Sequence, residues 1–441
     1  MYEDSYEASY TRERLELLMK IKTVEKSYEE VLALPTPAHP KPKKQKAFWR
    51  FLLKTFSAGE LKTVNFSHTT KNMEKIKQDE PCLYLMNHSS FIDLKIASTL
   101  IYPKPFHIIC TMDALVGKEK LMRNLGCIPT RKFVMDVNLV RDMIYAVNKL
   151  NGSLLLYPEA GYSFDGTATP LGEGLGKCIK MLGIPVVMIQ TTGAFLRDPL
   201  YNCLQLRQVN VSADMECILT KEEIENQTVN EINELVKKCF SFDQFCRQQE
   251  KQTYIAEGFR ADGLHRVLYK CPQCHTDGQM IGQGITLSCK NCGKEYTLTE
   301  QGYMKAQSGQ TEFAHIPDWY KWERECVREE IQNGFYKLDI PVQIGILKDT
   351  KALYMVGEGR LVHNKEGFHL TGCDGKLDYH QSSTASYTLN SDYFWYEIGD
   401  VINIGDAKML YYCFVNQEDN VVAKTRLATE EIYKIVQHNE L

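Results

Sequence analysis

The sequence predicts an α/β protein: a layered α/β domain with a mostly parallel sheet, then a small cysteine-rich ribbon, then a β-rich domain closed by a helix. Three observations support this. Short apolar runs alternate with helical segments between residues 60 and 215, as in β-α-β units. Two Cys-x2-Cys pairs follow. After residue 334, glycine and Asp/Asn turns separate strand-like runs, and a helical segment ends the chain.

The composition is that of a globular protein, with 441 residues, 44% hydrophobic and 24% charged. A net charge of −4 gives no global basic field, so we expect no nucleic-acid partner. No apolar run approaches the ~18 residues of a transmembrane helix. The acidic start, Met1–Asp4, lacks the apolar core of a signal peptide. We therefore expect the 15 cysteines to be reduced thiols in a cytoplasmic protein.

We expect five segments along the chain, because composition and pattern change four times. They are N-terminal helices with a basic-aromatic segment (1–59), the α/β domain (60–260), the ribbon (266–300), a helical linker (301–333) and the β-rich domain (334–441).

The N-terminal segment is predicted to begin with a helix over residues 5–33, where aliphatic side chains recur at roughly helical spacing. The proline-rich stretch 34–42 indicates an extended linker. Five basic residues then interleave with aromatic ones over 43–56, with no acidic residue between Val31 and Gly59. A helix of this kind suits a membrane interface with anionic headgroups. A buried helix with a solvated basic rim is the alternative.

In the α/β domain the apolar runs predict strands, and the longer periodic segments between them predict helices. A polar turn with a short helix is expected over 72–79, a helix closed by Gly126 over 121–126, and a flexible turn over 172–177. The expected strands are 61–66, 82–86, 106–110, 153–157 and 184–189, and the other expected helices are 90–100, 137–150 (ended by Gly152) and 175–182. Ligands of such sheets collect at the carboxyl ends of strands, where His88, Arg131 and Glu159 fall.

The stretch 82–93 carries the first candidate chemistry. Its apolar run breaks at Asn87-His88 and restarts as a helix, so His88 sits on a strand-to-helix turn. Asp93 lies about one and a half helical turns later and can fold back toward the imidazole. A histidine fixed by a carboxylate is a general base near neutral pH. The alternative is that Ser90 and Asp93 form only a capping box.

Four sequence blocks, in order, resemble those of the glycerolipid acyltransferase family, the lysophosphatidic-acid type, over residues 60–215. The third block matches in part, because that family has Phe-Pro-Glu-Gly-Thr-Arg-Ser where this chain has Tyr157-Pro158-Glu159-Ala160-Gly161-Tyr162-Ser163. The other blocks are Asn-His-x4-Asp at Asn87, His88 and Asp93, Gly-x4-Arg at Gly126 and Arg131, and an apolar strand with proline at Ile184–Val186.

The resemblance implies direct transfer of a fatty acyl chain from an acyl thioester, acyl-coenzyme A or acyl-carrier protein, to a lipid hydroxyl. The expected acceptor is 1-acyl-glycerol-3-phosphate. His88 would take the hydroxyl proton, and Asp93 would hold the imidazole tautomer. Backbone N–H groups at the turn are expected to stabilise the oxyanion. No covalent acyl-enzyme is required.

The resemblance also implies a substrate-binding set. Arg131 would bind the acceptor phosphate with its planar fork, and Glu159 would position acceptor hydroxyls. The full set is Asn87, Ser89, Gly126, Arg131, Glu159 and Gly161. The expected partners are a membrane surface and its lipid substrate, with an acyl-carrier protein as a further partner if it is the donor in place of acyl-coenzyme A. We therefore expect a cytoplasmic, peripheral membrane protein.

The third block departs from the family at Ala160, Gly161 and Tyr162. Tyr162 removes an arginine, so positive charge at the acceptor site would have to come from elsewhere, for example Lys132 or Arg141. Two alternatives follow: an acyltransferase for a non-phosphate acceptor, and a catalytically silent lipid-binding or scaffold protein. A nucleic-acid-binding zinc protein is a third hypothesis, against which the charge balance argues.

The ribbon is predicted from Cys271, Cys274, Cys289 and Cys292, spaced Cys-x2-Cys-x14-Cys-x2-Cys between strand-like runs. This spacing is typical of a zinc ribbon. Four thiolates close a tetrahedral shell, so the zinc is expected to be structural and the ribbon to brace neighbouring domains.

The C-terminal part is predicted to start with a helix over 316–331, for which Pro317 suits the first turn. Strands are expected at 342–347, 352–356 and 408–415, and a last helix at 428–437. This element order resembles the pleckstrin-homology-like architecture. The region has no basic cluster that would indicate phosphoinositide binding.

Overall fold

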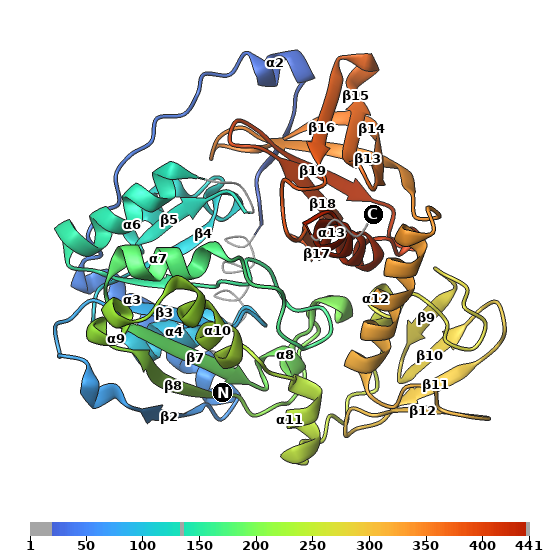
Figure 1. Ribbon diagram of the computed structural model, residues 1–441, viewed down its shortest axis with the longest axis horizontal. Helices are drawn as coiled ribbons and strands as arrows, with labels where there is room; N and C mark the ends of the chain where they lie inside the picture. The colour runs from blue at the N-terminus through green and yellow to red at the C-terminus, as the bar shows by residue number, and fades with distance from the viewer. Residues whose placement is uncertain (1–19, 133–135, 438–441) are drawn as a thin grey trace, which may run out of the picture.

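The computed structural model describes residues 20–132 and 136–437. Three β-sheets, each with its own helices, follow one another along the chain (Figure 1). The part of the predicted first helix that precedes residue 20 lies outside the described residues.

The first sheet forms the centre of the α/β domain. Its strands β7, β3, β6, β4 and β5 run parallel, whereas β8 is antiparallel to β7 and pairs in parallel with β2. The predicted mostly parallel sheet is therefore present. In spatial order the strands are β2 (Ser67–Lys71), β8 (Ser212–Leu219), β7 (Val186–Thr192), β3 (Leu83–Met86), β6 (Ser153–Leu156), β4 (Phe106–Thr111) and β5 (Cys127–Thr130).

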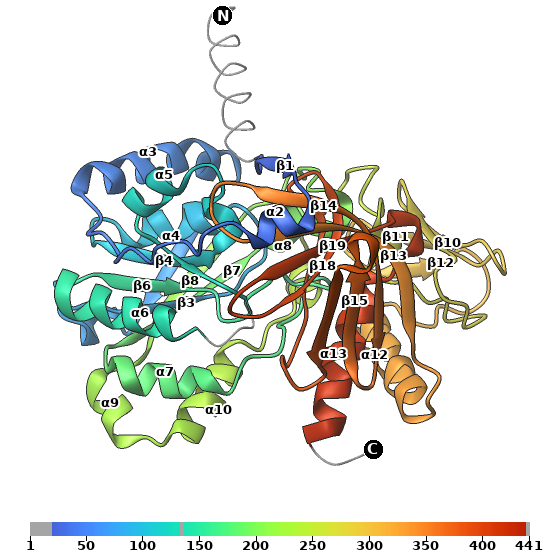
Figure 2. The ribbon, with the colours of Figure 1, turned by 90° about the horizontal axis from the view of Figure 1, so that it is seen from above.

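Helices cover both faces of this sheet, which explains why its central strands are apolar throughout (Figure 2). Tyr84 and Met86 of β3 point to one core, together with helices α3 (Ala47–Thr63) and α4 (Asp93–Ile101). Leu83 and Leu85 point to the other. The helices there are α6 (Val137–Leu150), α7 (Gly174–Leu182), α9 (Lys221–Asn226) and α10 (Val229–Cys239), and α5 (Glu119–Asn124) precedes β5.

Some predicted boundaries are wrong. Residues 61–66 do not form a strand, because α3 continues to Thr63, across the expected domain boundary at residue 59. Leu61 and Val64, each 5% exposed, lie one helical turn apart and pack together into the core. The first strand of this sheet is β2, at 67–71. Asn151, with φ of +51°, ends α6 one residue before Gly152.

The N-terminal segment joins the C-terminal sheet. Strand β1 (Thr23–Glu25) pairs in parallel with β14, and helix α2 (Tyr28–Leu32) follows, capped by Ser27 and Glu30. The predicted continuous helix is therefore wrong for residues 20–27, because main-chain pairing with the sheet edge overrides the local periodicity. Residues 34–46 then cross to the α/β domain without regular secondary structure, as the prolines predict.

The ribbon is a four-stranded antiparallel sheet packed against a long helix. Its strands are β9 (Met280–Gln283), β10 (Thr286–Cys289), β11 (Glu295–Leu298) and β12 (Met304–Ala306). Helix α12 (Ile316–Gln332) has Pro317 in its first turn, as predicted. The buried Trp319 indole donates to the Lys270 carbonyl at 3.0 Å, so α12 and the ribbon form one packing unit.

The C-terminal region is an antiparallel sheet followed by helix α13 (Val422–Gln437), which packs against α12 and starts six residues before the expected 428. Antiparallel strands with a terminal helix agree with the expectation, and the pleckstrin-homology-like description stays an interpretation. In spatial order the strands are β16 (Leu377–Ser382), β15 (Gly367–Gly372), β14 (Leu353–Asn364), β13 (Leu338–Leu347), β19 (Leu410–Val415), β18 (Gly399–Gly405) and β17 (Asn390–Trp395).

Across residues 20–132 and 136–437, no helix combines the length and the apolar content that crossing a bilayer requires.

Candidate active site

The β3–α4 turn (residues 87–92) brings His88 and Asp93 together, as expected. His88 Nδ1 lies 3.1 Å from Asp93 Oδ2. The same carboxylate oxygen accepts the backbone N–H groups of Ser89, at 2.7 Å, and Ser90, at 3.0 Å. Asp93 is fully buried at the start of α4, where a helix favours negative charge. The carboxylate is thus fixed by the backbone as well as by the imidazole, whereas a catalytic role for the pair stays a prediction.

The imidazole of His88 is held between two tyrosine rings. Tyr157 and Tyr162 stack on it with ring centroids 4.1 Å and 4.0 Å away. Burial lowers the pKa of His88 below its ordinary value, although the Asp93 carboxylate opposes this shift. Nε2 has no hydrogen-bond partner among the residues that the structure describes, and the side chain is 22% exposed. A neutral ring with its proton on Nδ1 therefore presents a basic Nε2 to an incoming group.

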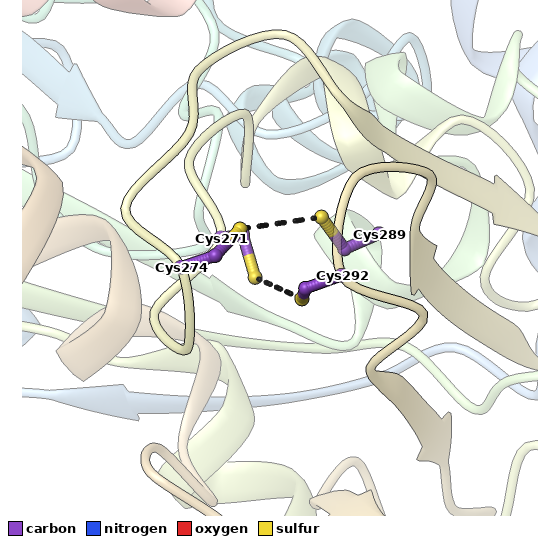
Figure 3. Close-up of side chains that lie close together, drawn as sticks. All are labelled: Cys271, Cys274, Cys289 and Cys292. Carbon is purple, nitrogen blue, oxygen red and sulfur yellow. Dashed lines mark hydrogen bonds between the residues drawn. The ribbon is translucent and has the colours of Figure 1, made fainter.

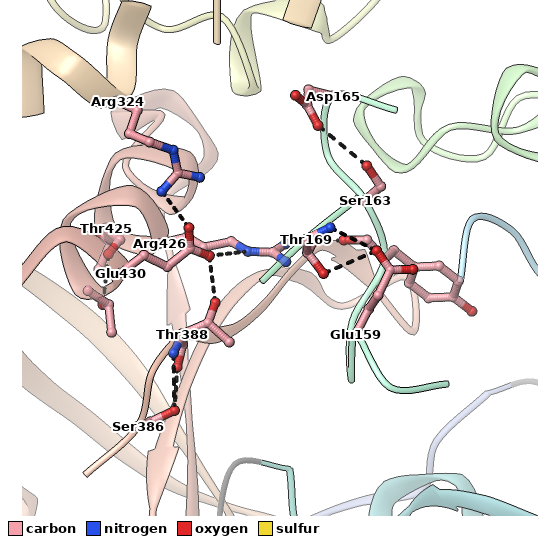
Figure 4. Close-up of polar contacts among 12 residues, drawn as sticks. Glu159, Ser163, Asp165, Thr169, Arg324, Ser386, Thr388, Thr425, Arg426 and Glu430 are labelled. Atoms are coloured by element: carbon pink, nitrogen blue, oxygen red, sulfur yellow. Dashed lines mark hydrogen bonds and ion pairs between the residues drawn. The ribbon is translucent and has the colours of Figure 1, made fainter. Parts of the chain in front are cut away.

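Glu159 connects this turn to the β6–α7 loop (residues 157–173). Its Oε2 accepts the backbone N–H of His88 at 3.0 Å, and its Oε1 accepts the N–H and hydroxyl of Thr169 at 2.8 and 3.2 Å. Figure 4 shows the bonds to Thr169. Burial raises the pKa of Glu159 to about 7 against these donors. Both oxygens already have protein partners, through which Glu159 joins the turn to the loop, and contact with an acceptor hydroxyl stays a prediction.

The expected oxyanion donors at the turn are engaged elsewhere. The N–H groups of His88, Ser89 and Ser90 all donate to the carboxylates of Glu159 and Asp93. The prediction that these turn N–H groups face the oxyanion is wrong for these three residues, because two buried carboxylates need the same donors.

Asn87 and Ser89, both predicted to bind substrate, are buried residues of the turn whose side chains bond to each other. Asn87 is fully buried. Its Oδ1 accepts the Thr191 N–H at 2.7 Å, and its Nδ2 donates to the Ser89 hydroxyl at 3.0 Å. These bonds tie the end of β3 to the end of β7, and substrate contact by either residue stays a prediction.

The second block places a cation at the sheet edge. Gly126 has φ of +95°, and a Cβ there would lie 2.6 Å from the Phe106 carbonyl oxygen, so only glycine fits. Its predicted substrate contact is untested. Arg131 follows β5, three strands from β3, which is about 14 Å along the sheet. Its Nε is buried without a hydrogen-bond partner in the described part of the chain. Lys132, the residue after Arg131, adds a second positive charge. Its charge lowers the pKa of His88, as burial of the imidazole also does.

The third block is strained and contains contacts that the sequence pattern does not reveal. Ala160 has φ of +52°, which is unfavourable for alanine. Gly161, predicted to bind substrate, lies next to a side chain from α13, and its role is untested.

Tyr157 and Tyr162 hold His88 between their rings, a role that was not predicted from the sequence. The only sequence feature that could have indicated this role is their place in the block that departs from the family. Asp392 of β17 also faces this region: burial raises its pKa to about 7 against the charge of Lys132.

The four ribbon cysteines form a candidate metal centre (Figure 3). The Sγ atoms of Cys271 and Cys292 lie 3.7 Å apart, as do those of Cys274 and Cys289, and all four lie within 4.8 Å of one another. A disulfide would need about 2.05 Å. Four sulfurs at about 2.3 Å from a tetrahedral zinc lie about 3.8 Å apart. The donor set and its spacing therefore fit zinc.

A match to a family model agrees with the interpretation of the α/β domain. Residues 67–191 match the family model described as Acyltransferase, which includes all four blocks but less than a third of the chain. A search of curated proteins finds no match. A solved structure with some likeness is the 1-acyl-sn-glycerophosphate (LPA) acyltransferase PlsC from Thermotoga maritima, at 16% identity over 43% of this chain and 76% of that one. Its TM-score is 0.36.

Proposed function

We propose that the chain is an acyltransferase that moves a fatty acyl chain from an acyl thioester to a lipid hydroxyl, with His88 as general base and Asp93 as its partner. One observation carries the proposal. Within the segment that matches the Acyltransferase model, a histidine whose Nε2 has no partner among the described residues rests on a buried carboxylate through Nδ1.

The proposed reaction needs no covalent enzyme intermediate. The neutral imidazole accepts the hydroxyl proton at Nε2 while the oxygen attacks the thioester carbonyl. Asp93 stabilises the imidazolium that forms. As the tetrahedral intermediate collapses, the new C–O bond stays, the C–S bond breaks, and the thiolate takes the proton from His88. The lowered pKa of His88 suits this step, because it favours the neutral ring that can accept a proton.

For the acceptor we propose a lipid with a phosphate group, such as 1-acylglycerol-3-phosphate, with acyl-coenzyme A or acyl-carrier protein as donor. Arg131 and Lys132 supply adjacent positive charge after β5. The buried Nε of Arg131 supports this choice, because a phosphate oxygen would satisfy a donor that otherwise has no partner among the described residues.

We also propose that helix α3 rests on the membrane that supplies this lipid. Phe48, Phe51 and Phe56 are 62%, 58% and 61% exposed, while Ser57 and Leu61 on the opposite face are buried. Exposed apolar side chains that gather on one helix face indicate a site of interaction with a membrane or a protein. Lysines at 43, 44, 46 and 54 add positive charge that attracts anionic headgroups.

A thiol-release assay tests the proposal. The purified chain receives acyl-coenzyme A with lysophosphatidate or with a monoacylglycerol, which differ by the phosphate, on anionic vesicles. We expect thiol release with lysophosphatidate and a labelled diacyl product. Release only with the monoacylglycerol would support the non-phosphate alternative. A last assay uses a lipid extract with acyl-coenzyme A and with acyl-carrier protein as donors. If no thiol is released with either lipid or in this last assay, acyl transfer is contradicted and a silent lipid-binding protein is favoured.

A further inference from the structure

The β6–α7 loop contacts the C-terminal region along its length. In the first half of the loop, the carbonyl of Tyr162 accepts a hydrogen bond from Arg426 of α13. Figure 4 shows the Arg426 side chain between Glu430 and the loop residues Glu159 and Thr169. In the middle, the ring of Phe164 packs against Tyr393 of β17 with centroids 4.6 Å apart. Near its end, a Cβ on Gly172 would lie 3.0 Å from the Tyr387 ring. A loop of the α/β domain therefore depends on residues more than 200 positions later.

Arg426 makes the most specific of these contacts. Its side chain is 5% exposed, and Nη1 donates to the Tyr162 carbonyl at 3.1 Å. The guanidinium lies over the Phe164 ring, 4.5 Å from its centroid. Nη2 would be 3.9 Å from a Cβ at Gly161. Nε faces Glu430 at 3.5 Å, which keeps the buried charge paired. Only a planar guanidinium can stack and donate in this way.

This contact reaches the histidine through Tyr162. The ring of Tyr162 stacks on His88, and the next residue, Ser163, donates its N–H to the His88 carbonyl at 3.3 Å. Glu159, which holds the His88 N–H, is also affected: burial raises its pKa, and the charge of Arg426 opposes this shift. Arg426 thus acts on Tyr162 and Glu159, which fix the position of His88, and does not itself contact His88.

We infer that Arg426 is a positioning residue for acyl transfer: from α13 it holds the β6–α7 loop so that Tyr162 and Glu159 keep His88 in place. The C-terminal region is then a part of the active site of the α/β domain and not an independent appendage. This inference rests on the proposed function.

The test compares R426A with K434A. Lys434 lies on the same helix, is 44% exposed and pairs with Glu431, so it is a matched control outside the site. For R426A we expect kcat to fall by roughly 100-fold, the loss associated with about 1 Å of misplacement, with little change in the KM of either substrate. K434A keeps the kcat of the unaltered chain.

Chemical rescue adds a readout that a general loss of stability would not move. Arg426 lines a cavity of about 290 Å³ together with Phe164 and Arg324, so a small cation can enter where the side chain is removed. We expect millimolar guanidinium to restore kcat of R426A and to leave K434A unchanged. R426K, which keeps the charge but cannot form both contacts, should have an intermediate kcat.

Hydrogen exchange of the β6–α7 loop separates this inference from the proposed function, because it needs no turnover. We expect faster exchange over 157–173 in R426A than in K434A. If the unaltered chain releases no thiol, the proposed function fails while the exchange result still reports on the contact. Equal exchange in the two variants, equal kcat, or a change only in the KM of a phosphate-bearing acceptor would each overturn the inference.

Discussion

The β3–α4 turn and the β6–α7 loop both hold His88, but they are built in different ways. The turn is closed by its own residues, because Asp93 binds the His88 imidazole and accepts from Ser89 and Ser90, all within six positions. The loop relies on residues from β17 and α13. One half of the site is therefore encoded locally, whereas the other half forms only when the whole chain has folded.

Asp93→Asn should remove the negative charge beside His88 and reduce turnover more than any change to the loop. An amide oxygen in the place of Oδ2 can still accept all three N–H groups, but the negative charge that stabilises the imidazolium is lost. We expect kcat to fall by roughly 10³- to 10⁴-fold, measured by thiol release. Asp79→Asn, at an exposed carboxylate before β3, is the control, and an active D93N would show that the turn does not prepare the histidine.

Glu159→Gln breaks the link between turn and loop. The amide nitrogen would face either the His88 N–H or the Thr169 N–H. Two hydrogen-bond donors would then oppose each other, which costs about 1–3 kcal/mol of stability. We expect a roughly 10- to 100-fold lower kcat and a shifted His88 imidazole resonance by NMR. Normal turnover with an unshifted resonance would mean that the two parts of the site are independent.

Metal removal should affect the loop more than the turn. The ribbon is tied to α13 by Lys424 and Asp277, which lie 2.5 Å apart, and α13 carries Arg426. We expect about one zinc per chain by metal analysis, and a lower thermal midpoint with turnover about tenfold lower after chelation. A metal-free chain of unchanged stability would refute the zinc assignment.

The acidic limb of the pH profile reports on His88, and Glu159 of the loop, whose pKa burial raises to about 7, adds a second ionisation. Because burial lowers the pKa of His88 below 6.5, the base becomes neutral, and kcat/KM rises, as pH increases through a midpoint below 6.5. Above pH 7 this limb should be flat. Removing Asp93, which raises this pKa, should move the midpoint to still lower pH in any residual activity. A midpoint above 6.5 would contradict a desolvated histidine.

Ala160→Gly relieves strain in the loop and should have the smallest effect. Alanine with φ of +52° costs about 1 kcal/mol relative to glycine in this conformation. We expect a small rise in the free energy of unfolding, measured in denaturant, with kcat nearly unchanged. A destabilised A160G variant would show that the methyl group contributes packing that outweighs the strain.

The same contrast explains what could be predicted from the sequence. The His88–Asp93 contact and the four-cysteine cluster follow from spacing within short stretches, and the parallel sheet follows from apolar runs between helices. Each depends on local geometry, which a linear pattern records.

The failures involve distant partners. Residues 61–66 resemble a strand because a short apolar run fits the spacing of a helix as well as that of a strand. Helix α3 continues to Thr63 because Leu61 and Val64 pack into the core. Thr23–Glu25 is a strand because it pairs with β14. The N–H of His88 donates to Glu159, 71 positions away, and not into the site. Nothing in the order of residues indicates that Arg426 reaches Tyr162.

The central claim is that His88 removes the acceptor proton, and His88→Ala tests it most directly. Thiol release from acyl-coenzyme A should be measured for H88A and for H68A, which alters an exposed histidine on β2, with circular dichroism to verify the fold. We predict that H88A loses at least as much kcat as D93N, roughly 10³-fold or more, while H68A is unchanged. A folded H88A that turns over at the rate of H68A would contradict the account.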